Sequence, residues 1–371
     1  MFPKYTKRSF LFFLLFTHSA FSQISVAGRV EDEWSHKALS NASVFFNYTT
    51  IATHTDQQGN FQFSNLSLSN LDIVVFYPGY ELLTFRPTPQ NIKGKKVVFR
   101  LKRKMPEAKK LIVNDRSRKF VIRVFCEMLL GSTREADDYK LINDGSIYFL
   151  QGENQRQLKL MSNVPLSIVN EKLGYKLNYY LLECSFNDST KQTGVYGFVK
   201  YESFNDSKKC RANRKKVYEG GTLHFFRSLV SHQLYQQHFE VYSIKPVVDP
   251  ARLQTLPENL LKTDSGATLL DPIADQDLLY IDSMNEISIR TNNKLMIYYS
   301  KNPSGRNDMA AHGLTEGMLT KGVQSFIDFE ASPIGINYNG VLEDNKGVKF
   351  SGYWIYEQLA NKLPFDYEPS D

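Results

Sequence analysis

The stretch TDQQGNFQF, residues 55–63, decides the fold of the N-terminal part of the chain. It begins with a turn, in which the Asp56 side chain can bond the following backbone and Gly59 can adopt a positive φ angle. The turn leads into Phe61 and Phe63, which alternate with polar residues as in a strand with one buried face. One carboxylate is too few for calcium, which takes six or more oxygen ligands. The stretch therefore predicts a β-hairpin and no metal site.

Further short strands are predicted on both sides of this hairpin. Their residues alternate in hydrophobicity or form short apolar runs, and turn residues such as Pro78-Gly79 separate them. Regular short strands with turns between them are typical of a β-sandwich, so we expect one over residues 23–103. The predicted strands lie at 24–30, 42–46, 61–63, 71–76 and 97–101.

The same residues resemble the carboxypeptidase regulatory-like domain. The similar parts are Gly28-Arg29-Val30, the strand at 42–46, the hairpin at 55–63 and the turn Tyr77-Pro78-Gly79-Tyr80. The resemblance implies a transthyretin-like sandwich of seven strands. It also implies an accessory module, which is appended to many exported proteins and is not itself a peptidase.

The first 22 residues are predicted to be a signal peptide. A basic start precedes an unbroken apolar run at 10–16, and the small residues Ala20 and Ser22 fit a cut after Ser22. The run is far shorter than the roughly 20 apolar residues of a membrane-spanning helix. An uncleaved N-terminal anchor is the alternative. We therefore expect an exported protein that lies in the periplasm or associates with the outer membrane.

A strongly basic segment follows the predicted sandwich. Residues Lys93–Lys119 contain twelve Lys or Arg against Glu107 and Asp115 alone, whereas the whole chain has a net charge of +6. Met105-Pro106 lies inside this segment, and we place a basic joint between two domains at 104–119. Such a segment can contact an anionic membrane surface, and a solvated strand end followed by a basic helix start is the alternative. The export signal argues against nucleic acid as a partner.

Residues 120–371 are predicted to form a larger α+β domain, so that the chain as a whole is mainly β with an α+β part. Apolar residues at three- and four-residue spacing indicate a helix at 118–130. The region from Ser207 to Phe239 indicates two helices that break at Gly220-Gly221, since glycine costs about 1 kcal/mol in a helix. The other predicted elements are strands at 146–150, 157–160, 175–186, 194–201, 286–290, 295–299 and 326–329, a hairpin joining 334–338 to 341–342 through Asn339-Gly340, and a short helix at 353–360.

This C-terminal region resembles the long segment that follows the regulatory-like domain in exported proteins of Bacteroidetes-type bacteria. That group has no assigned activity, so the resemblance implies an envelope location and no reaction. Gly221 departs from the group, which usually has Ser there. The matching residues are Leu130-Gly131, Leu141-Ile142-Asn143, Pro165-Leu166, Asn170, Leu173-Gly174-Tyr175, Asn213-Arg214, Tyr218, Gly220, His224-Phe225, Arg227, Gly352-Tyr353-Trp354 and Leu363-Pro364.

Motifs of the common hydrolases do not occur in the sequence. None of the seven histidines has Glu three residues later, as a zinc carboxypeptidase would need, and Gly-x-Ser-x-Gly is absent. We therefore expect no cofactor and no metal, and we favour a non-enzymatic protein that binds an envelope protein or a glycan. The alternative is a hydrolase of envelope or imported polymers whose site only the fold assembles. Paired carboxylates in a deep cleft, or a Cys beside a His, would favour that alternative.

The three cysteines, Cys126, Cys184 and Cys210, are too few for a scaffold held by disulfides. Three reduced thiols are the simplest interpretation, because Cys often acts as a small buried hydrophobe. If one pair forms in an oxidising compartment, we expect Cys184 to pair with Cys210, because Cys126 lies in an apolar helical pattern.

The candidate binding residues are Arg214, Tyr218, His224 and Arg227. They lie on the predicted helix pair, where Arg and His donors stand close in sequence to an aromatic ring. This combination suits an anionic or sugar ligand. A partly buried helix with a solvated polar face is the alternative.

Overall fold

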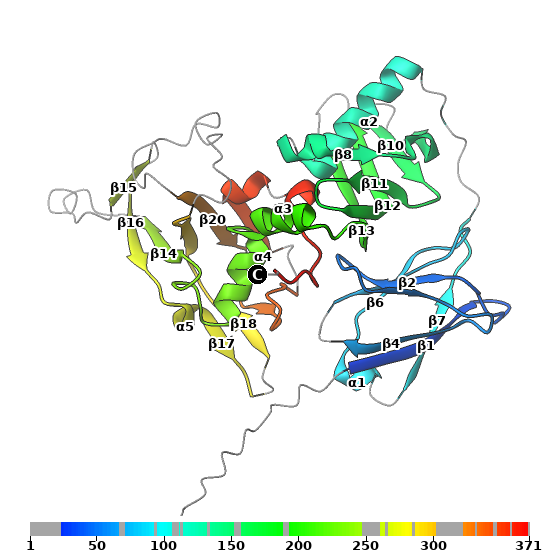
Figure 1. Cartoon of the computed structure of the whole chain (residues 1–371), viewed down its shortest axis with the longest axis horizontal. Coiled ribbons are helices and arrows are strands. Elements are labelled where there is room, and N and C mark those ends of the chain that lie inside the picture. The colour runs from blue at the N-terminus through cyan, green and yellow to red at the C-terminus, as the bar shows by residue number, and fades with distance from the viewer. Residues whose placement is uncertain are drawn as a thin grey trace, which may run out of the picture.

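The computed structural model describes residues 24–66, 71–92, 95–105, 111, 114–131, 134–151, 157–187, 193–246, 260–263, 266–283, 286–301, 322–330, 332–343, 347–356 and 358–369. The predicted signal peptide and most of residues 106–113 lie outside the described residues. Figure 1 shows three groups of elements: a blue sandwich, a teal and green sheet with helix α2, and a yellow and orange β unit. The predicted fold class is confirmed: the chain is mainly β, with an N-terminal sandwich and a larger α+β part.

The N-terminal unit is a sandwich of two sheets, in which β1 and β7 run parallel and the other paired strands are antiparallel. One sheet has the order β4-β1-β7 and the other the order β3-β2-β5-β6. Aromatic rings fill the space between the sheets, and Phe61 stacks on Phe99 with centroids 5.4 Å apart. The elements are β1 (Ile24–Asp32), β2 (Ser43–Phe46), β3 (Ala52–His54), β4 (Asn60–Leu66), β5 (Ile73–Phe76), β6 (Leu83–Phe85), α1 (Pro89–Ile92) and β7 (Lys96–Leu101).

The turn before β4 has the structure that its sequence predicts. The Asp56 carboxylate accepts backbone N–H groups from Asn60 at 2.7 Å and Gln58 at 2.9 Å. The bond from the Asn60 backbone in particular lowers the pKa of Asp56. Gly59 has φ +78°, and a Cβ there would lie 2.6 Å from the carbonyl oxygen of Val30, so only glycine fits. Asp56 therefore closes a turn.

The second unit is a six-stranded sheet packed against α2, in the order β8-β11-β12-β10-β9 with β13 beside β12. Asn114 caps α2 by accepting the Ser117 N–H at 2.9 Å, and this cap starts the helix three residues before the predicted position. The predicted strand pairs 146–150 with 157–160 and 175–186 with 194–201 are confirmed. The elements are α2 (Asp115–Leu130), η1 (Arg134–Asp138), β8 (Tyr139–Leu141), η2 (Asp144–Ser146), β9 (Ile147–Gln151), β10 (Gln157–Ser162), β11 (Leu166–Asn170), β12 (Tyr175–Asn187) and β13 (Thr193–Ser203).

The predicted helix pair and the third unit follow. Gly220, with φ +77°, separates α3 (Lys208–Tyr218) from α4 (Thr222–Val230), and this confirms the predicted break. The main sheet of the third unit has the order β15-β16-β14-β19-β20-β22, and a smaller sheet has the order β17-β18-β21. The elements are β14 (Phe239–Pro246), β15 (Leu260–Thr263), β16 (Gly266–Pro272), α5 (Asp275–Leu278), β17 (Leu279–Ile281), β18 (Ile287–Ile289), β19 (Lys294–Tyr299), β20 (Val323–Phe329), β21 (Ile334–Ile336) and β22 (Val348–Gly352).

Two predicted elements near the C-terminus differ from the structure. The hairpin at Asn339-Gly340 is reduced to one bridge between Ile336 and Leu342, because the Asn337 side chain closes the loop by accepting the N–H groups of Asn339 and Val341. The predicted helix at 353–360 is wrong in type. Two short 3-10 helices stand in its place, η5 (Tyr353–Tyr356) and η6 (Leu359–Asn361).

The predicted pairing of Cys184 with Cys210 is wrong, since all three cysteines are free. The Cys210 thiol lies 3.7 Å from the carbonyl oxygen of Glu171, just before β12 begins at Tyr175. Cys184 lies nine residues further along β12, roughly 30 Å away at the rise of an extended strand. A disulfide needs Cα atoms within about 7 Å.

Buried apolar side chains form a separate core in each unit, and a small fourth cluster joins two of the units. In that cluster, Phe45 and Val74 on the outer face of the sandwich pack against Tyr180 and Phe198 of β12 and β13. Phe45 stacks on Tyr180 with centroids 4.7 Å apart. No helix among the described residues is long and apolar enough to cross a membrane.

Candidate functional site

Residues 358–369 run between the three units and contact all of them. In Figure 1 this red segment lies at the centre of the molecule, beside α3 and α4. The Phe365 N–H donates to the carbonyl of Tyr48 in the sandwich at 2.7 Å. The Thr50 N–H donates to the Asp366 carboxylate at 2.9 Å, and the Thr50 hydroxyl donates to the same carboxylate. The segment is therefore fixed to the loop after β2.

The same segment is bonded to the sheet of the second unit. The Tyr139 hydroxyl donates to the carbonyl of Ala360 at 3.3 Å, and the Tyr201 hydroxyl donates to that of Lys362 at 3.2 Å. Both tyrosines are buried, and burial raises the pKa of each hydroxyl well above 10. They therefore stay protonated and act as hydrogen-bond donors.

Arg227 on α4 forms hydrogen bonds with the C-terminal segment 358–369. Its guanidinium donates to the carbonyls of Tyr367 at 2.6 Å, Phe365 at 3.1 Å and Asn339 at 3.2 Å. The Asn339 turn lies directly on α4, because a Cβ on Gly340 would meet the backbone nitrogen of Arg227 at 2.6 Å. Arg227 thus joins α4 to two separate loops.

His224 on α4 is buried and takes part in a fixed pair of hydrogen bonds. Its Nδ1 accepts the Gly220 N–H at 3.1 Å, so the proton of the neutral ring lies on Nε2, which is 3.1 Å from the Gln237 side-chain oxygen. Burial lowers the pKa of His224 to about 4. The Tyr218 ring lies 4.7 Å from the imidazole between centroids. His224 is therefore a neutral structural residue at pH 7.

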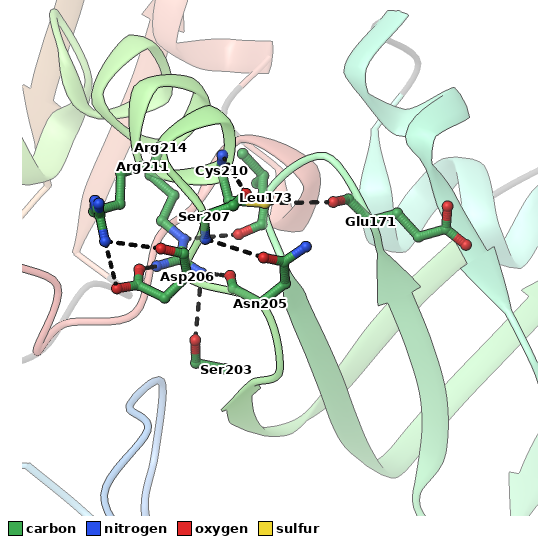
Figure 2. A network of polar contacts seen from close by, with 9 residues as sticks. All are labelled: Glu171, Leu173, Ser203, Asn205, Asp206, Ser207, Cys210, Arg211 and Arg214. Carbon is green, nitrogen blue, oxygen red and sulfur yellow. Dashed lines mark hydrogen bonds and ion pairs between the residues drawn. The ribbon is translucent and has the colours of Figure 1, made fainter.

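Arg214 on α3 lies one helical turn before Tyr218 and has hydrogen-bond partners of its own. Figure 2 shows its guanidinium among the carbonyls of Leu173 and Asn205 and the side chains of Asp206 and Ser203. The bonds to both carbonyls are 2.7 Å and the bond to Asp206 is 2.8 Å. Arg214 also lies 4.0 Å from the centroid of the Tyr175 ring. It fastens the start of α3 to the turn that leads into β12.

The structure thus brings together Tyr218, His224 and Arg227, and Arg214 lies one helical turn before Tyr218 on α3 with hydrogen-bond partners of its own. The guanidinium carbon of Arg227 lies 5.9 Å from the centroid of the Tyr218 ring, and the same ring lies beside the imidazole of His224. The guanidinium groups of Arg214 and Arg227 and the imidazole of His224 form hydrogen bonds with other residues of the chain. Ligand binding by these four residues stays a prediction.

An apolar pocket opens beside Tyr218, where the three units meet. It is a cavity of about 110 Å³. Its walls come from the loop after β2, from α3 and α4, from the loop before β22 and β22 itself, and from the C-terminal segment. The lining residues are Tyr48, Val217, Tyr218, Gly221, Thr222, Leu223, Phe226, Gly340, Val341, Leu342, Phe350, Asn361, Lys362, Leu363 and Phe365. Of the four predicted site residues, Tyr218 alone is in this lining.

Sequence reasoning missed the other residues of this pocket. Tyr48 and Phe365 are 317 positions apart, and their rings lie 5.4 Å apart between centroids. Neither residue belongs to a motif, and Lys362 is a single charged residue between Asn361 and Leu363. The one signal that pointed here was Tyr218 on the helix pair.

Some basic residues of the segment 93–119 form ion pairs with acidic residues of the sandwich. Arg103 lies 2.8 Å from Asp32, Arg100 lies 3.0 Å from Glu31, and Lys102 lies 3.5 Å from Glu81. Backbone and side-chain bonds, the largest from Ser35, hold the pKa of Asp32 well below its usual range. These arginines therefore close one end of the sandwich.

Two observations describe the metal-binding side chains and two of the thiols. Within the described ranges, three or more His, Cys, Asp or Glu side chains never gather closely enough to hold a metal ion. Burial raises the pKa of Cys126 to about 11 and that of Cys184 to about 12. Both thiols are therefore protonated at neutral pH.

Comparison with known proteins identifies the first unit. The family profile of the carboxypeptidase regulatory-like domain matches residues 26–113, so this part of the chain is a domain of that kind, as the sequence predicts. A solved structure from Bacteroides fragilis, described as a suspected membrane-associated protein of unknown function, is 9% identical and aligns over 88% of this chain and 92% of its own. Its TM-score of 0.17 is too low to carry an argument. No curated protein matches the chain.

Proposed function

We propose that this chain is an exported, non-catalytic envelope protein that binds a partner protein or glycan through the surface formed by its three joined units. The carboxypeptidase regulatory-like domain at residues 26–113 supports this proposal. The basic start and apolar run of residues 1–22 support export. Contact between the basic segment 93–119 and an anionic membrane surface stays a prediction.

One observation carries the binding role. The polar side chains of α3 and α4 hold the structure together: Arg227 bonds three carbonyls, Arg214 bonds two, and His224 is neutral and buried. Such groups do not exchange protons near pH 7. The C-terminal segment contacts the sandwich, the sheet and the helix pair, and units joined in this way suit a scaffold for binding.

The test is fractionation of native cells followed by mass spectrometry of the N-terminus. We expect the chain in the envelope fraction with Gln23 as its first residue. The purified protein is then used as bait with detergent-solubilised envelopes and with cell-wall polysaccharide, and the heat-unfolded protein is the control bait. A cytosolic chain that retains residues 1–22 contradicts export. A hydrolytic turnover that one substitution in α3 or α4 abolishes contradicts the non-catalytic role.

A further inference from the structure

We infer that the pocket at the junction of the three units binds the short apolar chain of a carboxylic acid, with the carboxylate facing Lys362. The inference rests on the proposed binding role and adds to it a small-molecule ligand, separate from the partner protein or glycan that the surface would bind. Three features of the pocket carry it: the residues that line its interior, its size, and the charge at its edge.

The interior of the pocket is apolar because the edges of three cores meet there. Val217 and Tyr218 lie at the edge of the core of the second unit, and Phe226 and Phe350 belong to the core of the third. Phe365 lies at the edge of the sandwich core. The polar side chains in the lining are those of Tyr48, Tyr218, Thr222, Asn361 and Lys362, and the other lining residues are apolar or glycine. A buried hydroxyl group without a hydrogen-bond partner costs on the order of 2 kcal/mol, which disfavours a sugar among these apolar residues. An apolar group is therefore favoured inside.

The size of the pocket limits the apolar group. A closed apolar cavity of roughly 150 Å³ in another protein stays dry and takes up benzene. The cavity here measures about 110 Å³, so it holds a group somewhat smaller than benzene, on the order of five carbons. A longer chain would extend out of the pocket. Short acyl chains fit this limit.

Lys362 sets the charge of the ligand. It is the one charged residue among the lining residues that the structure describes, and its Nζ lies 6.0 Å from the ring centroid of Tyr48, which also lines the pocket. Among the described residues, no carboxylate forms an ion pair with this ammonium group. A carboxylate at the pocket edge would gain a charge-assisted hydrogen bond with it. The pocket therefore selects an anionic head and an apolar tail.

The test compares three probes with the same chain by NMR titration of the purified protein: hexanoate, hexan-1-ol and hexylammonium. We expect hexanoate to bind most tightly and hexylammonium most weakly. The Lys362→Met variant should weaken hexanoate about fivefold, as expected for a half-exposed ion pair, and should leave hexanol unchanged. Lys215→Met, which removes an exposed lysine of α3 outside the pocket, is the matched control and should change nothing.

A second pair of variants tests the place of binding. Val217→Phe should fill the pocket and abolish binding of hexanoate and hexanol. The control Val164→Phe makes the same change at a site that is 45% exposed and outside the pocket. If Val217→Phe fails to fold by circular dichroism, Phe350→Ala takes its place, and the enlarged pocket should then prefer octanoate to hexanoate.

Several results would overturn the inference. These are equal binding of hexylammonium and hexanoate, equal binding by Val217→Phe and the wild type, or the same affinity for octanoate relative to hexanoate after Phe350→Ala. A titration with dihexanoyl phosphatidylglycerol distinguishes a free acid from a lipid as the source of the chain, since the lipid carries its charge on a phosphate. All of these measurements use the purified protein in solution. Their failure would leave the fractionation result, and with it the proposed envelope role, intact.

Discussion

Replacing Arg214 by Met should destabilise the protein by about 4.5 kcal/mol. Methionine keeps an aliphatic stem over the Tyr175 ring and removes the guanidinium. The bonds to the carbonyls of Leu173 and Asn205, both 2.7 Å, contribute about 1.5 kcal/mol each because the donor is charged. The cation–π contact with Tyr175 adds about 1 kcal/mol. The pair with Asp206 adds about 0.5 kcal/mol, since that carboxylate is 61% exposed.

The assay is urea unfolding followed by the fluorescence of Trp354. This indole is buried, and its Nε1 donates to the carbonyl of Gly220 at 2.9 Å, just after α3. Trp34 is 81% exposed and would add an uninformative signal, so the measurement uses the Trp34→Phe background. The midpoint and the slope together give the free energy of unfolding.

Arg211→Met is the matched control for this prediction. Arg211 shares Asp206 with Arg214, but its own side chain is 46% exposed. We expect this control to cost less than about 0.5 kcal/mol. A loss below about 1 kcal/mol for Arg214→Met, or equal losses for the two variants, would refute the structural role assigned to Arg214.

Three further predictions concern other groups. His224 has its pKa lowered to about 4 in the folded protein against about 6.5 in the unfolded chain, so its contribution is present above pH 6.5 and is lost as the pH falls towards 4. Between pH 7 and pH 4 the free energy of unfolding should therefore fall by up to about 3 kcal/mol more in the wild type than in His224→Gln, and an equal fall in both proteins would contradict this. Cys184 should resist iodoacetamide at pH 8 until the protein unfolds, and Cys126 should react slowly, because burial raises both thiol pKa values; rapid labelling of folded Cys184 by mass spectrometry would contradict this. Tyr180→Ala should cost about 3 kcal/mol and speed proteolytic release of the sandwich; unchanged proteolysis would show that the cluster does not hold the units together.

Local patterns predicted much of the fold because they depend on residues close in sequence. Helix α2 and the strand pairs β9–β10 and β12–β13 follow from periodicity, and the break at Gly220 follows from helix propensity. The short 3-10 helices near residue 355 were missed, because one turn of helix carries too few residues to show a period.

The candidate site was harder to predict, because its contacts join distant residues and backbone atoms. Arg227 was chosen as a ligand donor, yet its partners are carbonyls near residues 339 and 366, which no side-chain motif reveals. The pocket beside Tyr218 needs Tyr48 from the sandwich and Phe365 from the last segment. Such contacts become visible only when the units are assembled.

The position of the C-terminal segment also sets the order in which the protein can assemble. Thr50 and Asp366 are 316 residues apart, so their bonds close a loop of almost the whole chain. Most residues of each core come together through much shorter loops, and we expect these parts to form first. Leu359, Ala360, Leu363 and Tyr367 of the C-terminal segment then complete the core of the second unit. Until residues 358–369 have been synthesised and docked, the three cores have no segment that contacts all of them. Docking of this segment is therefore the closing step of folding, and the apolar space beside Tyr218 comes into being with it.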